Sequence, residues 1–182
     1  MSSIHIKKAV EIIASGGVIA YPTEGVWGLG CDPWNVDAVF KILKIKNRPW
    51  QKGLILIASQ VDQIKPLLSQ LTKEQIDRVC KSWPGAHTWI IPNDDLPIWL
   101  RGDHDSIALR VSNHKIVKQL CDTVGGPIVS TSANPAGKEP AKTALKVKCY
   151  FGDEIDYIVP GALSGLNKPT TIRDALTNQQ LR

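Results

Sequence analysis

The stretch Leu-Ile-Leu-Ile-Ala at residues 54–58 indicates the fold class, because it reads as a strand that is apolar on both of its faces. Such a strand must be covered on each side, as strands are in layered α/β proteins. A helix is expected before it, with Asn35 as its N-cap and an apolar stripe over residues 36–43. A second helix is expected after it, where Thr72 and Gln75 form a capping-box pattern.

The alternation of helical and strand patterns continues toward both ends of the chain. Further helices are predicted over residues 4–15, 116–121 and 143–151. Further strands are predicted over residues 18–21, 88–91, 106–112, 128–129, 157–159 and 171–176. No repeat or linker interrupts this order. We therefore predict an α/β fold in a single domain that spans residues 1–182.

The composition excludes several other classes of protein. Of the 182 residues, 43% are apolar and 21% are charged, which is usual for a globular domain. The four cysteines lack metal-site spacing, so we expect reduced thiols and no metal site. The longest apolar run, residues 54–58, is far shorter than the roughly 20 residues of a membrane span. No signal-peptide pattern opens the sequence, and we expect a cytoplasmic protein without membrane contact.

Three cations stand close together between a predicted helix and the strand at 54–58. They are Lys46, Arg48 and Lys52, and the whole chain carries a net charge of +5. Such cations can complement the dipole at a helix C-terminus. They can also form a polyphosphate clamp, in which Arg48 offers a bidentate fork and the lysines act as point charges. The charge balance favours an anionic ligand, either a nucleic acid or a phosphorylated small molecule.

A run of small polar residues, Ser-Thr-Ser-Ala-Asn at 130–134, follows the strand predicted over 128–129. Ligands bind beyond the carboxyl ends of strands in open α/β sheets, and three hydroxyls with one amide can line a sugar or phosphate site. The alternative is a turn held by local side-chain hydrogen bonds. A nucleophilic serine is disfavoured, because the chain has no Gly-x-Ser-x-Gly motif.

A glycine-rich segment lies near the N-terminus, at residues 21–30. Three glycines and a proline after a strand predict a loop whose backbone can approach a ligand closely. The sequence holds neither a Walker-type phosphate loop nor a dinucleotide fingerprint, so any nucleotide site must be of another type.

Arg110 occupies the polar face of the strand predicted over 106–112. A single arginine on a strand is more often an exposed charge at a sheet edge than a buried group. Together with the cations at 46–52, Arg110 could instead complete an anion cavity.

Six motifs in this order resemble those of one enzyme family. They are Tyr-Pro-Thr-Glu-x-x-x-Gly-Leu-Gly-Cys-Asp (21–32), Lys-x-Arg-Pro-x-x-Lys-Gly-Leu-Ile (46–55), Trp-Pro-Gly (83–85), Ala-Leu-Arg-Val (108–111), Ser-Thr-Ser-Ala-Asn (130–134) and Pro-Thr-Thr-Ile-Arg-Asp (169–174). The chain resembles the YrdC-type threonylcarbamoyl-AMP synthases in their bacterial short form, and the resemblance covers nearly its whole length. The resemblance implies a twisted mixed sheet with flanking helices around a large, basic, concave cavity.

The resemblance also implies an activity. The enzyme would combine L-threonine, bicarbonate and ATP, with Mg²⁺ bound to the ATP, and release pyrophosphate. The product, threonylcarbamoyl-adenylate, would serve partner proteins that modify adenosine 37 of tRNAs reading codons that begin with A. Binding of tRNA or double-stranded RNA is a further expectation.

The residues at the motif positions receive roles from the same resemblance. Catalytic contacts with the ATP phosphates fall to Lys46, Arg48 and Lys52. Other nucleotide contacts fall to Ser132, Asn134 and Arg182. The threonine pocket would be lined by Thr23, Arg110, Ser130 and Thr170. The loop before Thr170, at 160–169, is a candidate lid.

Two other kinds of function fit parts of the sequence. The positive charge also suits an RNA-binding or ribosome-maturation factor without catalysis, although the chain lacks an RNA-recognition aromatic motif. Proteins of the same fold could instead form a carbamoyl-adenylate or hydrolyse the adenylate. The presence of both the Lys-x-Arg and the Ser-x-Asn motif favours the synthase.

Overall fold

The computed structural model describes residues 3–166 and 170–182, and its strands form one mixed sheet. The strands are β1 (Ile19–Pro22), β2 (Trp27–Gly30), β3 (Ile55–Ala58), β4 (His87–Pro92), β5 (Ser106–Val111), β6 (Ile128–Ser132), β7 (Tyr157–Ile158) and β8 (Thr171–Asp174). Their order is β7-β1-β2-β6-β3-β5-β4-β8. Three neighbouring pairs are parallel and the others antiparallel. The predicted α/β class is confirmed, and the sheet is mixed as expected.

The helices flank this sheet. They are α1 (Ser3–Ala14), α2 (Val36–Ile45), α3 (Lys73–Lys81), α4 (Ile98–Arg101), α5 (Lys115–Val124) and α6 (Ala144–Phe151). The predicted caps are present: Asn35 accepts a hydrogen bond from the Ala38 amide, and Thr72 and Gln75 form a capping box. The short helix α4 was not predicted. Within the described residues, no helix has both the length and the apolar character that a membrane crossing requires.

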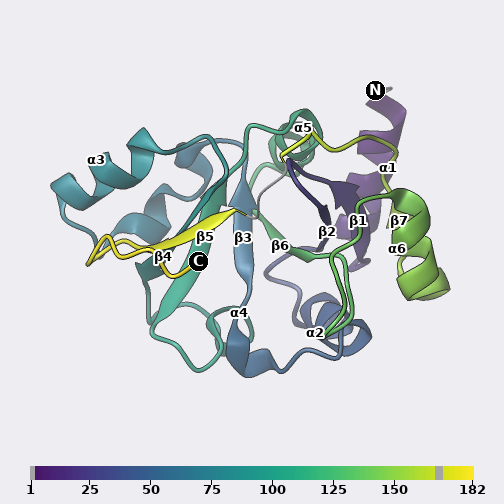
Figure 1. The fold of residues 1–182 in the computed structure, drawn as a ribbon, viewed down its shortest axis with the longest axis horizontal. Coiled ribbons are helices and arrows are strands. Elements are labelled where there is room, and N and C mark those ends of the chain that lie inside the picture. Colours follow the sequence, from purple (N-terminus) through teal and green to yellow (C-terminus); the bar gives the residue numbers. More distant parts are fainter. Residues whose placement is uncertain (1–2, 167–169) are drawn as a thin grey trace.

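Helices α1 and α5 pack together on one face of the sheet, near the N-terminus (Figure 1). They bury Tyr21, Ile57 and Ile128, which point to this face from β1, β3 and β6. The neighbouring residues Leu56 and Val129 point to the opposite face, where a larger core includes side chains of α2 and α4. Most of the apolar run at 54–58 therefore lies in a central strand that is covered on both sides, as its sequence predicts, and Ile55 is the partly exposed residue of that strand.

The face that α1 and α5 cover continues into an uncovered region. Side chains alternate along a strand, so Ile55 shares a face with Ile57, and Ser130 shares one with Ile128. The strand register places Ile90, Ala108, Ile55 and Ser130 in one row across four strands. These four residues line a cavity. The same sheet face is thus apolar beneath the helices and carries a binding site beyond them.

The glycine-rich segment at 21–30 is not the predicted loop. Strands β1 and β2 form an antiparallel hairpin, and only residues 23–26 lie between them. Gly30 lies in β2, where it pairs with Ile19, and the packing around it leaves no space for a side chain. A Cβ atom at this position would lie 2.6 Å from the Val129 carbonyl oxygen and 2.8 Å from the Tyr21 ring.

Gly30→Ala is therefore expected to lower the free energy of unfolding by about 1–3 kcal/mol, through overpacking against a fixed backbone carbonyl. Gly126→Ala is the matched control, because a Cβ there meets no atom within 4 Å. Chemical denaturation of both variants checks the prediction. Equal stabilities for the two would contradict it.

The predicted lid over 160–169 extends beyond the described part of the chain. Residues 167–169, which include the first residue of the sixth motif, lie outside the described residues. Before them, the Leu166 amide donates a hydrogen bond to the Glu24 carbonyl, and His114 contacts the Ala162 carbonyl at 3.1 Å. The segment up to residue 166 is thereby attached to the hairpin turn and to the start of α5.

Candidate active site

A cavity of about 460 Å³ lies over the uncovered part of the sheet. Among the residues that the structure describes, five cationic side chains line it: Arg48, Lys52, Arg101, Arg110 and Arg182. No Asp or Glu of the described residues lines it. The volume falls within the range of small-molecule sites, and the charge suits an anionic ligand.

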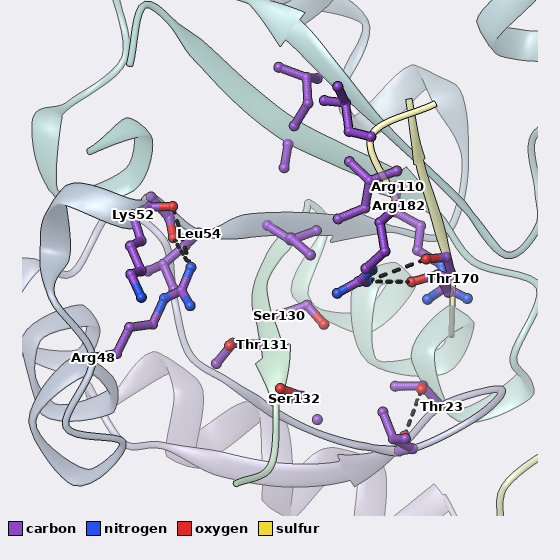
Figure 2. Close-up of a pocket in the computed structure, with 18 of the residues that line it drawn as sticks. Thr23, Arg48, Lys52, Leu54, Arg110, Ser130, Thr131, Ser132, Thr170 and Arg182 are labelled. Carbon is purple, nitrogen blue, oxygen red and sulfur yellow. Dashed lines mark hydrogen bonds between the residues drawn. The ribbon is translucent and has the colours of Figure 1, made fainter. Parts of the chain in front are cut away.

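Most of the predicted site residues meet in this cavity. Those that line it are Thr23, Arg48, Lys52, Arg110, Ser130, Ser132, Thr170 and Arg182. Figure 2 shows Arg48 and Lys52 on one side, and Arg110, Arg182 and Thr170 on the other. The hydroxyls of β6 lie between the two groups. Lys46 and Asn134, also predicted, are not part of this lining.

Arg48 is held in place by backbone carbonyls just after the end of α2. Its Nη2 donates to the Gly53 carbonyl at 2.8 Å and, more weakly, to the Lys52 carbonyl at 3.3 Å. Partial burial lowers the pKa of Arg48, but an arginine remains a cation at neutral pH. The guanidinium is thus fixed beside the cavity before any ligand arrives, which suits it to bind phosphate.

Lys46 is directed elsewhere. Its side chain is buried, and its ammonium donates hydrogen bonds to the carbonyls of Ser132 and, at 2.6 Å, Asn134. Its own carbonyl accepts from the Ala136 amide at 2.8 Å. Burial, assisted by the charge of Arg48, lowers the pKa of Lys46 to about 8. The structure therefore connects Lys46 to the wall of the cavity, and its predicted contact with phosphates stays a prediction.

The serine-rich stretch forms that wall. Ser130, Thr131 and Ser132 all line the cavity from β6, beyond the part of the strand that α1 and α5 cover. Asn134 instead holds its own loop, since its Nδ2 donates to the carbonyls of Pro135 and Lys138 at 3.0 and 2.7 Å. These residues therefore bring three hydroxyl groups to the lining between the two cationic ends, and the Ser130 hydroxyl also forms a hydrogen bond with Tyr21.

Arg110 is not an exposed edge charge, so that alternative is wrong. It lies on β5, between β3 and β4, and its side chain is only 8% exposed. The Glu24 carboxylate lies 2.6 Å from its Nη2 and supplies the countercharge that a buried guanidinium requires. Burial lowers the pKa of Arg110, while Glu24 acts in the opposite direction.

The C-terminal segment closes the same side of the cavity. The amides of Leu181 and Arg182 both donate to the Ile172 carbonyl, so the segment runs beside β8. The Arg182 side chain then donates to the Thr170 carbonyl at 3.3 Å and contacts the Thr170 hydroxyl at 3.5 Å. These two predicted residues are therefore in direct contact, as Figure 2 shows.

Several cavity residues were missed at the level of sequence. Period-two alternation with Arg110 would have identified Ser106 and Ala108 on the same face of β5. Arg101 is the last residue of α4 and His104 follows the helix, and no local pattern marks either of them. Arg101 is already occupied by the carbonyls of Leu96 and His104.

Comparisons with known proteins agree with the fold and with the motifs. A family profile described as "Telomere recombination", which covers the Sua5, YciO and YrdC proteins, matches residues 11–182. The threonylcarbamoyl-AMP synthase of Hahella chejuensis is 51% identical over 184 residues, with both chains fully covered. That of Pseudomonas aeruginosa PAO1 is 50% identical over 183 residues, covering 100% of this chain and 98% of that protein.

A solved structure of P. abyssi Sua5 complexed with L-threonine superimposes with a TM-score of 0.85 at 30% sequence identity. The match covers 93% of this chain and 50% of that one, so the chain spans about half the length of that Sua5 protein. Both the family profile and the sequence relatives extend over nearly all of the chain. The chain therefore belongs to the Sua5/YciO/YrdC family.

Proposed function

We propose that this protein is a threonylcarbamoyl-AMP synthase, a nucleotidyltransferase that forms L-threonylcarbamoyladenylate from L-threonine, bicarbonate and ATP. One observation carries the proposal: all of the predicted threonine-pocket residues and most of the predicted phosphate and nucleotide residues line a single cavity that has cations at both ends. The synthase relatives at about 50% identity support the same activity.

The two ends of the cavity have different tasks. Arg48 and Lys52 receive the phosphates of ATP, where they neutralise charge as pyrophosphate departs. Arg110 receives the carboxylate of threonine, with Thr23 and Ser130 nearby in the lining. The hydroxyls of β6 orient the groups that react between these ends.

The reaction has two steps. The neutral amine of threonine attacks CO₂, formed from bicarbonate by loss of hydroxide, and gives up a proton to become a carbamate. A carbamate oxygen then attacks the α-phosphorus of ATP, and the bond from that phosphorus to the bridging oxygen breaks to release pyrophosphate. Positioning and charge neutralisation carry this chemistry, because no covalent enzyme intermediate is needed.

Mg²⁺ enters as part of the ATP substrate. The described lining of the cavity offers cations and hydroxyls but no Asp or Glu, and the described residues hold no cluster of three acidic, His or Cys side chains suited to a metal. The phosphate oxygens and water would therefore supply most of its ligands, as is usual for this ion.

The product is an activated threonylcarbamoyl group. In the proposed setting, separate transfer proteins in the cytoplasm pass this group to adenosine 37 of tRNAs that read codons beginning with A. The protein is then a tRNA-processing enzyme. Contact with tRNA would bring the threonylcarbamoyl-adenylate close to the tRNA that receives the group.

The test is pyrophosphate release from ATP and bicarbonate, measured with L-threonine, L-serine, glycine or no amino acid. Release should depend on threonine, and kcat/KM for serine should be about 10- to 200-fold lower, because one methyl group is worth about 1–3 kcal/mol in an apolar pocket. Equal turnover of threonine and glycine would contradict a shaped threonine pocket.

The same assay separates the alternatives. Release that requires carbamoyl phosphate in place of threonine would identify a carbamoyl-adenylate enzyme. Consumption of synthetic threonylcarbamoyl-adenylate without its formation would identify a hydrolase. An absence of any release, together with RNA binding that weakens steeply with salt, would identify a binding protein.

A further inference from the structure

Glu24 lies in the hairpin turn between β1 and β2 and is not among the residues that line the cavity. Its side chain is only 13% exposed. One carboxylate oxygen, Oε2, lies 2.6 Å from Arg110 Nη2. The other, Oε1, accepts hydrogen bonds from the Ser112 hydroxyl at 2.8 Å and the Asn113 amide at 3.2 Å. The carboxylate is therefore fixed to the end of β5 from two sides.

These contacts determine which part of Arg110 remains for a ligand. Its Nε donates to the Gly85 carbonyl at 3.1 Å, and its Nη2 faces Glu24. No described residue accepts a hydrogen bond from Nη1. The guanidinium is thus oriented by the protein on two sides, and Nη1 is left to meet the substrate.

Glu24 also changes the charge at this end of the cavity. The Arg110–Glu24 pair has no net charge, whereas Arg48, Lys52 and Arg182 have no acidic side-chain partner among the described residues. A polyanion such as a triphosphate gains most where cations are uncompensated. A zwitterionic amino acid, which carries one carboxylate and no net charge, needs a fixed donor more than an excess of positive charge.

We propose that Glu24 is a positioning and specificity residue, which orients Arg110 toward the amino-acid carboxylate and keeps phosphate groups from binding to Arg110. This inference rests on the proposed function, because it takes the amino acid to bind at Arg110. It assigns a role to the acidic residue of the Tyr-Pro-Thr-Glu segment, to which the sequence pattern assigned none.

The test uses Glu24→Gln, which keeps the size of the side chain and removes its charge. Steady-state kinetics should show KM for L-threonine raised 10-fold or more and KM for ATP changed less than 2-fold. Inorganic phosphate should become a competitive inhibitor against threonine, with an inhibition constant at least 5-fold lower than for the unmodified protein. Glu11→Gln, on the exposed side of α1, is the matched control for loss of one carboxylate.

A second variant guards against a failure of folding. Glu24→Asp keeps the negative charge but shortens the side chain by one methylene group, which moves the carboxylate away from Arg110. This variant should raise KM for threonine without making phosphate a competitive inhibitor against threonine. Equal changes in both KM values, or an unchanged KM for threonine in folded Glu24→Gln, would overturn the proposal.

The effect of phosphate can also be measured in the absence of catalysis, by thermal denaturation. Phosphate should raise the thermal midpoint of Glu24→Gln more than that of the unmodified protein. Equal shifts of the two midpoints would show that Glu24 does not keep phosphate from binding, even if no synthase activity existed. Threonine-independent pyrophosphate release by the unmodified protein would instead count against the proposed function alone.

Discussion

Replacing Arg48 with alanine should lower threonine-dependent pyrophosphate release by about 10²- to 10³-fold in kcat/KM for ATP. Arg48 is a cation in the cavity lining that the carbonyls of Lys52 and Gly53 already orient, so it stabilises developing charge without prior reorganisation. Initial rates of pyrophosphate release over a range of ATP concentrations provide the measurement.

Lys44→Ala is the control for this substitution. Lys44 lies in the last turn of α2, four residues before Arg48, and it is exposed and outside the cavity lining. Its loss should change kcat/KM less than 2-fold. A folded Arg48→Ala protein with near-normal kcat/KM would show that the phosphates bind elsewhere.

Replacing Lys46 with methionine should lower the free energy of unfolding by about 2–4 kcal/mol at pH 7. The substitution removes the donor for the Ser132 and Asn134 carbonyls, and hydrogen bonds from charged groups contribute about 1.5–3 kcal/mol each. Because Ser132 lines the cavity, activity should fall together with stability. Chemical denaturation gives the first quantity, with Lys44→Met as the exposed control.

The same variant has a pH signature. The pKa of Lys46 is about 8 in the folded protein and 10.5 for an ordinary lysine. Between these values the unfolded chain binds more protons than the folded one, so this residue makes stability rise with pH, by at most about 1.4 kcal/mol per unit. The stability advantage of the unmodified protein over Lys46→Met should therefore grow from pH 8 toward 10. If the difference in stability between the two proteins stayed constant over this pH range, the pKa of Lys46 would not be lowered and the lysine would be solvated.

Much of the fold was predictable because its signals are local. The caps at Asn35 and Thr72 and the buried strand at 54–58 depend only on neighbouring residues, and all three are confirmed. Strand β2 was missed because glycines usually favour loops. Gly30 pairs with Ile19 in the sheet, and the position requires glycine because the Val129 carbonyl, far away in the sequence, leaves no space for a side chain.

The site, like the fold, was predictable only where the signals are local in the sequence. Motif order identified the cationic cluster and the hydroxyl run, but it could not tell which side chains point into the cavity. Lys46 and Arg48 differ by two positions, yet only Arg48 belongs to the lining. Arg110 is buried because Glu24, from a distant turn, supplies its countercharge. Such pairings depend on tertiary contacts, which a local pattern does not contain.

The row formed by Ile90, Ala108, Ile55 and Ser130 has a consequence for how the chain reaches its active state. These residues come from four strands that are far apart in the sequence, and long-range strand pairing is slow compared with the formation of local structure. The floor of the cavity exists only once those strands have paired. A nucleotide that binds there would stabilise the folded protein. It would not assist folding before these strands have paired, because the binding site does not yet exist.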